Sequence, residues 1–337
     1  MLTIRLGLIQ IRFLPRALRY MVKNEEGASG EVTSFGALCT ALSATIGTGN
    51  IVGVSTAICT GGPGALFWMW IAAFVGMATK FSECLLSVKY RHIAEKGHIL
   101  GGPFMYIEKG MGKNWRWLAK IFAFFGAGVG LLGIGTFTQV NGIATATKDF
   151  FDPTAAHTVT LFGHSYSWVV VITAIVVALL TGLVVIGGLK RIAKVSEVIV
   201  PFMAVLYFIA CLFVLIVNAE ALPGAIAMIF DGAFTGTAAV GGFAGAVMKE
   251  AIQMGVARGI FSNESGLGSA PIATAAAKTN WPARQGLVSM TGTFIDTIII
   301  CTMTGLAVDV YKRQTLGIGL HSMTNLLPSG EPSQVMI

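Results

Sequence analysis

Charged residues are scarce in this sequence: they make up 12% of its 337 residues, whereas 54% are hydrophobic. Soluble globular domains carry about 25% charged residues. Uncharged stretches of 20 residues or more recur along the chain, and about 20 apolar residues suffice for a helix that crosses a bilayer. The composition therefore excludes an ordinary soluble protein and predicts an all-α polytopic membrane protein whose surroundings are a lipid bilayer.

The motifs of metal centres, disulfide frameworks and enzymes are also missing. The five cysteines form no C-x-x-C pair, and the five histidines have no ligand spacing. The sequence has no H-E-x-x-H, no paired aspartates, no nucleophile elbow and no filter repeat of the kind that lines channels. We expect neither an enzyme nor a cofactor nor a transition-metal site. The net charge of +7 comes from basic residues between apolar spans, which argues against nucleic-acid binding.

Glycine is abundant where a helix would need other residues. The charge-free run 32–79 contains the sequence S-A-T-I-G-T-G-N-I-V-G, with Gly47, Gly49 and Gly53. Glycine in a helix interior costs about 1 kcal/mol relative to alanine, so we predict a membrane helix broken near residues 47–50. Broken backbone in a bilayer needs surrounding protein or a water-filled cavity. The alternatives are a small-residue packing face between helices and a dinucleotide loop, although the spacing is not G-x-G-x-x-G.

A second glycine cluster, 241–245, lies in the uncharged part of a later span, 234–257. If the spans alternate, most lysines and arginines fall on one side of the membrane, and Lys148, Lys278 and Arg284 fall on the other. The two broken helices then run in opposite directions. Paired, opposed breaks indicate an inverted-repeat transporter whose site lies at the midplane.

This reasoning divides the chain into four segments. They are a partial or interfacial N-terminal helix with its connection (1–31), a first five-helix repeat (32–218), the start of an inverted second repeat (219–308) and an atypical polar tail (309–337). We expect a loop or re-entrant piece around Asp231, and a polar loop over 148–167.

The breaks suggest a site for a small zwitterion. The N–H groups that a half-helix leaves unpaired favour a carboxylate. At the first break these groups and the nearby side chains would come from Gly47, Thr48, Gly49 and Asn50. At the second break, Gly241 and Gly242 would face them, with Phe243 as an apolar wall.

Two polar residues occur in the span 121–147. Gln139 and Asn141 are two residues apart, so only one is expected to face a site. We favour Gln139, and the alternative is an interhelical hydrogen bond.

The span 286–308 contains an aspartate. Thr293, Asp296 and Thr297 share one helix face, and an aspartate inside a membrane is functional by default. We predict that they bind Na⁺, with Thr45 as a further candidate ligand; the alternative is a structural hydrogen-bond cluster. Lys80 and Glu83, three residues apart, are expected to form an ion pair.

Several long motifs resemble the alanine or glycine:cation symporter family. They are T-I-G-T-G-N-I-V-G-V (45–54), G-G-P-G-A-L-F-W-M-W (61–70), G-I-F-S-N-E-S-G-L-G-S-A-P (259–271) and G-T-F-I-D-T (292–297). The resemblance implies a LeuT-type inverted-repeat bundle that imports L-alanine or glycine with Na⁺, or H⁺ in some members, by alternating access. It places Thr48, Gly49, Asn50, Gln139 and Phe243 at substrate-facing positions. It also implies the plasma membrane, the inner membrane of a prokaryote.

Members of that family are longer at both ends. They have a complete helix before the first broken one and further helices after the span that ends near Val308. The resemblance therefore implies a bundle that is incomplete at both ends. An inactive fragment of a symporter and a passive channel are the alternative functions.

Overall fold

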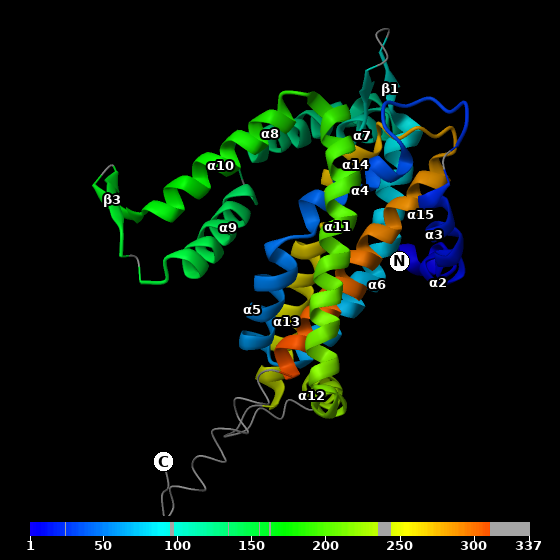
Figure 1. Ribbon diagram of the computed structural model, residues 1–337. Helices are drawn as coiled ribbons and strands as arrows, with labels where there is room; N and C mark the ends of the chain where they lie inside the picture. Colours follow the sequence, from blue (N-terminus) through cyan, green and yellow to red (C-terminus); the bar gives the residue numbers. More distant parts are fainter. Residues whose placement is uncertain are drawn as a thin grey trace, which may run out of the picture.

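A computed structural model describes residues 1–23, 25–94, 98–133, 135–154, 156–161, 163–234 and 244–310. Helices dominate it, and Figure 1 shows them as one upright bundle with an arm that extends to one side. The α-helices are α1 (Leu2–Arg5), α2 (Ile9–Arg12), α3 (Leu14–Val22), α4 (Ser34–Thr45), α5 (Val54–Gly61), α6 (Gly64–Tyr90), α7 (Pro103–Met111), α8 (Arg116–Leu132), α9 (Thr136–Phe151), α10 (Trp168–Val185), α11 (Gly188–Val217), α12 (Leu222–Phe234), α13 (Ala244–Asn263), α14 (Ser269–Thr274) and α15 (Pro282–Thr293). Shorter turns are the π-helical η1 (Gly49–Gly53) and η4 (Phe294–Cys301) and the 3₁₀-helical η2 (Lys113–Trp115) and η3 (Ala219–Ala221).

Helices long and apolar enough to cross a membrane confirm the polytopic class. In the part of the chain that is described there are five, or six if the bent pair 34–45 and 49–61 counts as one span. Five of them correspond to the predicted spans around α6, α8–α9, α10, α11 and α15, and the bent pair to the first broken helix. The predicted span 234–257 includes residues outside the described ranges.

Two short hairpins qualify the prediction of an all-α protein. Strands β1 (His92–Ile93) and β2 (Ile99–Leu100) pair antiparallel, as do β3 (Thr158–Leu161) and β4 (His164–Ser167). The second hairpin lies where we predicted a polar loop and closes the end of the arm formed by α9 and α10 (Figure 1). Threonine and valine favour extended backbone, and Gly163 has the positive φ of +82° that a tight turn requires.

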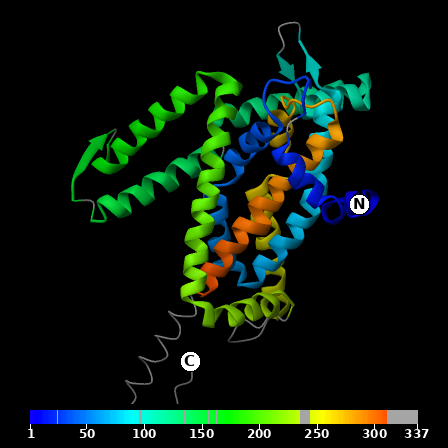
Figure 2. The same ribbon diagram turned by 45° about the vertical axis from the view of Figure 1, so that its right-hand side comes forward.

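Small residues decide how the central helix α6 packs. Gly255 and Gly259 of α13 lie against Ala65 and Met69 of α6, so these two helices run parallel. A Cβ built on Gly255 would come 2.3 Å from the Ala65 carbonyl oxygen. Side chains of this size let helix backbones approach closely in a membrane. The α6 helix is therefore held between α13 on one side and α15, which runs antiparallel to it, on another (Figure 2).

Gly64, at the start of α6, should not tolerate even a methyl group. A Cβ there would lie 2.2 Å from the Gly232 carbonyl carbon of α12. Because the obstacle is backbone, we expect Gly64→Ala to lower the free energy of unfolding by about 1–3 kcal/mol. The matched control is Gly182→Ala in α10, where a Cβ meets nothing within 4 Å. Thermal unfolding of the two purified variants in detergent measures the difference, and equal melting temperatures would contradict this packing.

Other boundaries differ from the sequence-based expectations. Helix α12 occupies the region predicted as a loop or re-entrant piece around Asp231, so the loop alternative is wrong, and Figure 1 shows the helix lying across one end of the bundle. The span 121–147 is divided between α8 and α9, because Gly133 and Gly135 have φ values of +62° and +88°. The N-terminal segment, predicted as one partial or interfacial helix, forms the three short helices α1, α2 and α3, and apolar side chains from residues 6–20 pack on α6 and α15.

The topology after α13 also needs a correction. Helix α13 continues past residue 257 to Asn263, and α14 has six residues, or about 9 Å, which is too short to cross a membrane. The Lys278 N–H donates to the Val32 carbonyl at 2.7 Å. Arg284 donates to the Lys23 carbonyl at 2.5 Å. Lys278 and Arg284 thus lie at the same end of the bundle as the N-terminal segment, whereas we predicted them on the opposite side.

Candidate functional site

The first glycine cluster breaks a helix, as predicted. Helix α4 ends at Thr45, η1 begins at Gly49, and the axes on either side differ by 55°. Ile46 leaves the helix with φ −76° and ψ +106°, which is extended backbone. The chain then continues through the wide π-helical turn η1 into α5. Such π-helical turns are rare and occur frequently at functional sites.

Two amide side chains accept hydrogen bonds from N–H groups at the break. The Gly47 N–H donates to Asn50 Oδ1 at 2.8 Å. The Thr48 N–H donates to Gln139 Oε1 at 2.9 Å, so α9 contacts the break at the residue that we favoured. A side chain on Gly47 would collide with the Gln139 amide, because its Cβ would lie 2.5 Å from Oε1. In this conformation, these two N–H groups are already engaged.

Asn50 connects the break to the last described span. Its Nδ2 lies 3.0 Å from Ser262 Oγ of α13 and 2.9 Å from Asp296 Oδ1 of η4. It also lies 3.2 Å from the Asp296 carbonyl oxygen and 3.3 Å from Cys301 Sγ. Asn50 is 1% exposed. Because this side chain contacts the break, α13 and η4, a displacement of any one of them changes its hydrogen bonds.

The Asp296 carboxylate is fully buried, with 0% exposure. Besides the bond from Asn50, its Oδ2 accepts from Ser262 Oγ at 2.7 Å and from Thr297 Oγ1 at 2.8 Å. Asn263 Nδ2 donates to Thr297 Oγ1 at 3.1 Å, which extends the network. No lysine or arginine of the described residues lies within 4 Å of this carboxylate.

The chemistry of this cluster suits a hard cation. It brings together the oxygens of a carboxylate, two hydroxyls and a main-chain carbonyl, and oxygen ligands of this kind bind hard cations in proteins. Within the described ranges no group of three or more His, Cys, Asp and Glu side chains suits a metal ion.

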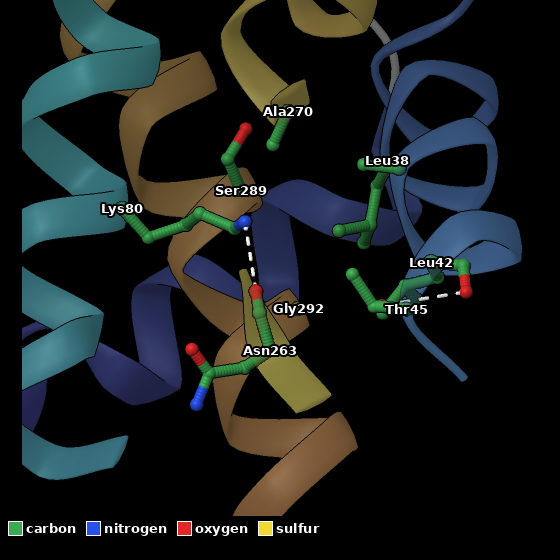
Figure 3. Close-up of a pocket in the computed structure, with 9 residues that line it drawn as sticks. Leu38, Leu42, Thr45, Lys80, Asn263, Ala270, Ser289 and Gly292 are labelled. Atoms are coloured by element: carbon green, nitrogen blue, oxygen red, sulfur yellow. Dashed lines mark hydrogen bonds between the residues drawn. The ribbon is translucent and has the colours of Figure 1, made fainter. Parts of the chain in front are cut away.

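The structure separates the other predicted cation ligands. Thr293 shares a hydrogen bond of 3.0 Å with Ser265, beside the Asp296 cluster. Thr45 donates weakly to the Leu42 carbonyl at 3.4 Å and has no hydrogen bond to the Asp296 cluster. Figure 3 shows a small cavity whose wall includes Thr45, Lys80 and Asn263. The cavity measures about 10 Å³, which is roughly the room for one water molecule.

Lys80 places a cation at the end of α13. Its Nζ donates to the carbonyl oxygens of Asn263 at 3.0 Å and Glu264 at 3.3 Å, as Figure 3 shows for the first. Glu83 Oε1 lies 3.9 Å from the same Nζ, which confirms the predicted pair, and accepts the Gly266 N–H at 3.4 Å. Sequence reasoning did not predict that this pair would hold the α13–α14 junction.

A larger cavity opens beside the break. It measures about 270 Å³ and lies between η1, α5, α9 and α13. The residues in its wall are Thr48, Gly49, Val52, Gly53, Thr56, Thr138, Asn141, Gly142, Arg258 and Phe261. Asn141 is thus on the cavity while Gln139 contacts the break, so both residues lie at this region. We expected only one of them to do so.

Three residues were not predicted from the sequence as part of this site. Ser262 and Cys301 contact Asn50, and Arg258 lies in the wall of the larger cavity. Ser262 and Arg258 are separated by four residues and share a face of α13, which was a usable signal. The predicted substrate residues Gly241, Gly242 and Phe243 lie outside the described residues.

Comparisons with known proteins agree with these observations. A family model described as the sodium:alanine symporter family matches residues 1–327. An uncharacterized transporter of Haemophilus influenzae is 59% identical over 305 residues, which cover 90% of this chain and 63% of that protein. The sodium/alanine symporter AgcS of Methanococcus maripaludis is 48% identical over 315 residues, with coverages of 92% and 65%.

The name of a more distant relative refers to a different substrate, glutamine. The probable sodium/glutamine symporter GlnT of Bacillus subtilis is 38% identical over 327 residues, which cover 94% of this chain and 63% of that protein. The chain therefore spans between 63% and 65% of the length of these three curated relatives.

Proposed function

Because the chain belongs to the sodium:alanine symporter family, we propose that the protein imports a small neutral amino acid, L-alanine or glycine, together with Na⁺. Family members are transporters, so the proposed activity is transport and not catalysis. The apolar helices make this an integral membrane protein, and we propose the plasma membrane of a prokaryote as its location. H⁺ is the alternative coupling ion if transport does not depend on Na⁺.

One observation carries the proposal: Asn50 bonds the broken helix to the buried Asp296 carboxylate. A cation at Asp296 would draw the hydroxyls of Ser262 and Thr297 toward itself through their oxygens, and would compete with Asn50 for Oδ1. Asn50 in turn holds the Gly47 N–H. Binding of Na⁺ and release of an N–H group at the break are therefore coupled through one side chain.

The substrate would bind at the break itself. We propose that its carboxylate replaces Asn50 and Gln139 as the acceptor of the Gly47 and Thr48 N–H groups. Gly49 would let the substrate approach the backbone closely. The prediction that Gly241, Gly242 and Phe243 line the facing half concerns residues outside the described ranges. Na⁺ would be held by Asp296 and Thr297, with Thr293 next to them and Thr45 as the weakest candidate.

A LeuT-type inverted repeat with alternating access is the architecture we propose for the complete bundle. The arrangement of α13 supports it: Gly61 lies near Ala251 and Met254, and Gly49 lies near Ser262, so α13 runs antiparallel to the first broken helix. The repeat boundary near residue 218 stays a prediction, as does the character of residues 309–337.

Uptake into proteoliposomes tests the proposal. The purified protein is reconstituted, and entry of radiolabelled L-alanine is followed with and without an inward Na⁺ gradient. We expect gradient-driven, saturable uptake that Asn50→Leu abolishes, because leucine cannot bridge Gly47 and Asp296. Thr48→Val should preserve more of the activity, since the Thr48 contact to Gln139 uses the main-chain N–H.

Two outcomes would contradict the proposal. Equal uptake without the gradient would exclude coupled transport and favour a passive channel. No uptake by a chain that inserts and folds would mean that these residues form an inactive part of a longer symporter. Both alternatives predict that Asn50→Leu has no effect on Na⁺-dependent uptake, because none exists.

A further inference from the structure

The large cavity beside the break contains one charged side chain. Among the ten residues of its wall, Arg258 is the only one with an ionisable group; the others are glycine, threonine, asparagine, valine and phenylalanine. Arg258 belongs to α13, which packs along α5 and α6 through the bundle. The Phe261 ring lies 3.7 Å from the Cβ position of Gly49, so this part of α13 packs against the broken helix. Arg258 shares the cavity wall with Thr48 and Gly49.

Arg258 has no hydrogen-bond or ion-pair partner among the residues that the structure describes. It is half-buried. A guanidinium within a membrane bundle is costly, and such groups are normally paired or face a pathway for a polar solute. Because none of the described carboxylates pairs with it, Arg258 gives the cavity a positive charge that a ligand can neutralise.

The dimensions of the cavity fit a small organic anion or zwitterion. Its volume of about 270 Å³ is far larger than the one-water cavity of about 10 Å³ beside Lys80. Gly49 and Gly53 form part of the wall without side chains, and a Cβ on Gly53 would meet nothing within 4 Å. Thr48 and Asn141 add neutral polar groups to the wall. A carboxylate in this cavity would face a single fixed cation.

The N–H groups of Gly47 and Thr48 are engaged by Asn50 and Gln139 in this conformation. In this conformation, the guanidinium is therefore the group of the cavity wall that can bind a carboxylate without any change at the break. We propose that Arg258 is a substrate-binding residue that holds the carboxylate of the amino acid in this cavity, next to the break. The inference rests on the proposed function and deepens it, since it names the group that first recognises the substrate.

The guanidinium suits this role because its planar fork binds a carboxylate through two parallel hydrogen bonds. Lysine at the same position would keep the charge but lose the fork. Arg258→Lys should therefore bind the amino acid more weakly than the wild type, and Arg258→Gln more weakly still.

Equilibrium binding of radiolabelled L-alanine to the purified protein in nanodiscs, in the presence of Na⁺, tests the proposal. We expect Arg258→Gln to raise the dissociation constant about 10- to 100-fold, which is the usual effect of losing a charged hydrogen bond. Arg258→Lys should fall between Arg258→Gln and the wild type. The matched control is Lys249→Gln, which removes the same charge from an exposed position of α13 outside the cavity.

A competitor without the carboxylate separates recognition from stability. Alaninamide should displace alanine poorly from the wild type, and Arg258→Gln should lose most of this discrimination between the two ligands. If Arg258 had a purely structural role, Arg258→Gln would weaken the binding of alanine and of alaninamide equally. If the wild type binds alanine, either of two results for Arg258→Gln would overturn the proposal. One is an unchanged affinity for alanine, and the other is an unchanged preference for alanine over alaninamide. Failure of the wild type to bind any alanine would instead overturn the proposed function.

Discussion

Asp296→Asn is expected to abolish Na⁺-driven alanine uptake while leaving the fold intact. The substitution keeps the size of the side chain, and Asn50, Ser262 and Thr297 can still bond to the new carboxamide oxygen or reorient. It removes the one negative charge of the buried cluster. At an effective dielectric constant of about 20, two unit charges 4 Å apart attract by about 4 kcal/mol. The affinity for Na⁺ should therefore fall by two to three orders of magnitude.

The dependence of uptake on Na⁺ concentration measures this effect. Asp149→Asn is the matched control, because it makes the same chemical change at an exposed position of α9. A variant that melts like the wild type but no longer responds to Na⁺ would support a cation at Asp296. Undiminished Na⁺ dependence in Asp296→Asn would show that the cluster is a structural hydrogen-bond network, the alternative that the sequence left open.

Lys80→Met is expected to destabilise the protein by about 3–5 kcal/mol, the usual cost of leaving one member of a buried pair alone. Lys80 is 3% exposed and Glu83 is 7% exposed. Methionine leaves the Glu83 carboxylate without its cation, and the carbonyls of Asn263 and Glu264 lose their donor. The α13–α14 junction should loosen first, because Lys80 and Glu83 form hydrogen bonds with its backbone.

The double variant separates charge from packing. Lys80→Met combined with Glu83→Gln removes both charges, so it should be more stable than Lys80→Met alone. Lys89→Met on the same helix is the control, because Lys89 is exposed and should cost less than about 1 kcal/mol. Denaturation in detergent, followed by tryptophan fluorescence, provides the measurement. A double variant less stable than the single one would contradict the argument from an unpaired buried carboxylate.

Several features could be predicted because they are local. The membrane class follows from composition, and the break near Gly47 follows from three glycines whose backbone preference does not depend on distant contacts. The Lys80–Glu83 pair follows from helical spacing. The α12 helix and the hairpin of β3 and β4 were missed, because short segments between spans have weak periodicity and depend on what they pack against.

The sequence by itself determined that this chain is a membrane protein with a broken first span and an aspartate in its last described span. Each of these features depends only on residues that are neighbours in the chain. Only the tertiary structure decided that Asn50, Ser262 and Asp296 meet, and that Arg258 faces the same cavity as Thr48. Their meeting depends on the rotation and crossing of helices that are far apart in the chain. Small residues such as Gly255 and Gly259 set that crossing through contacts with α6, which no local pattern specifies.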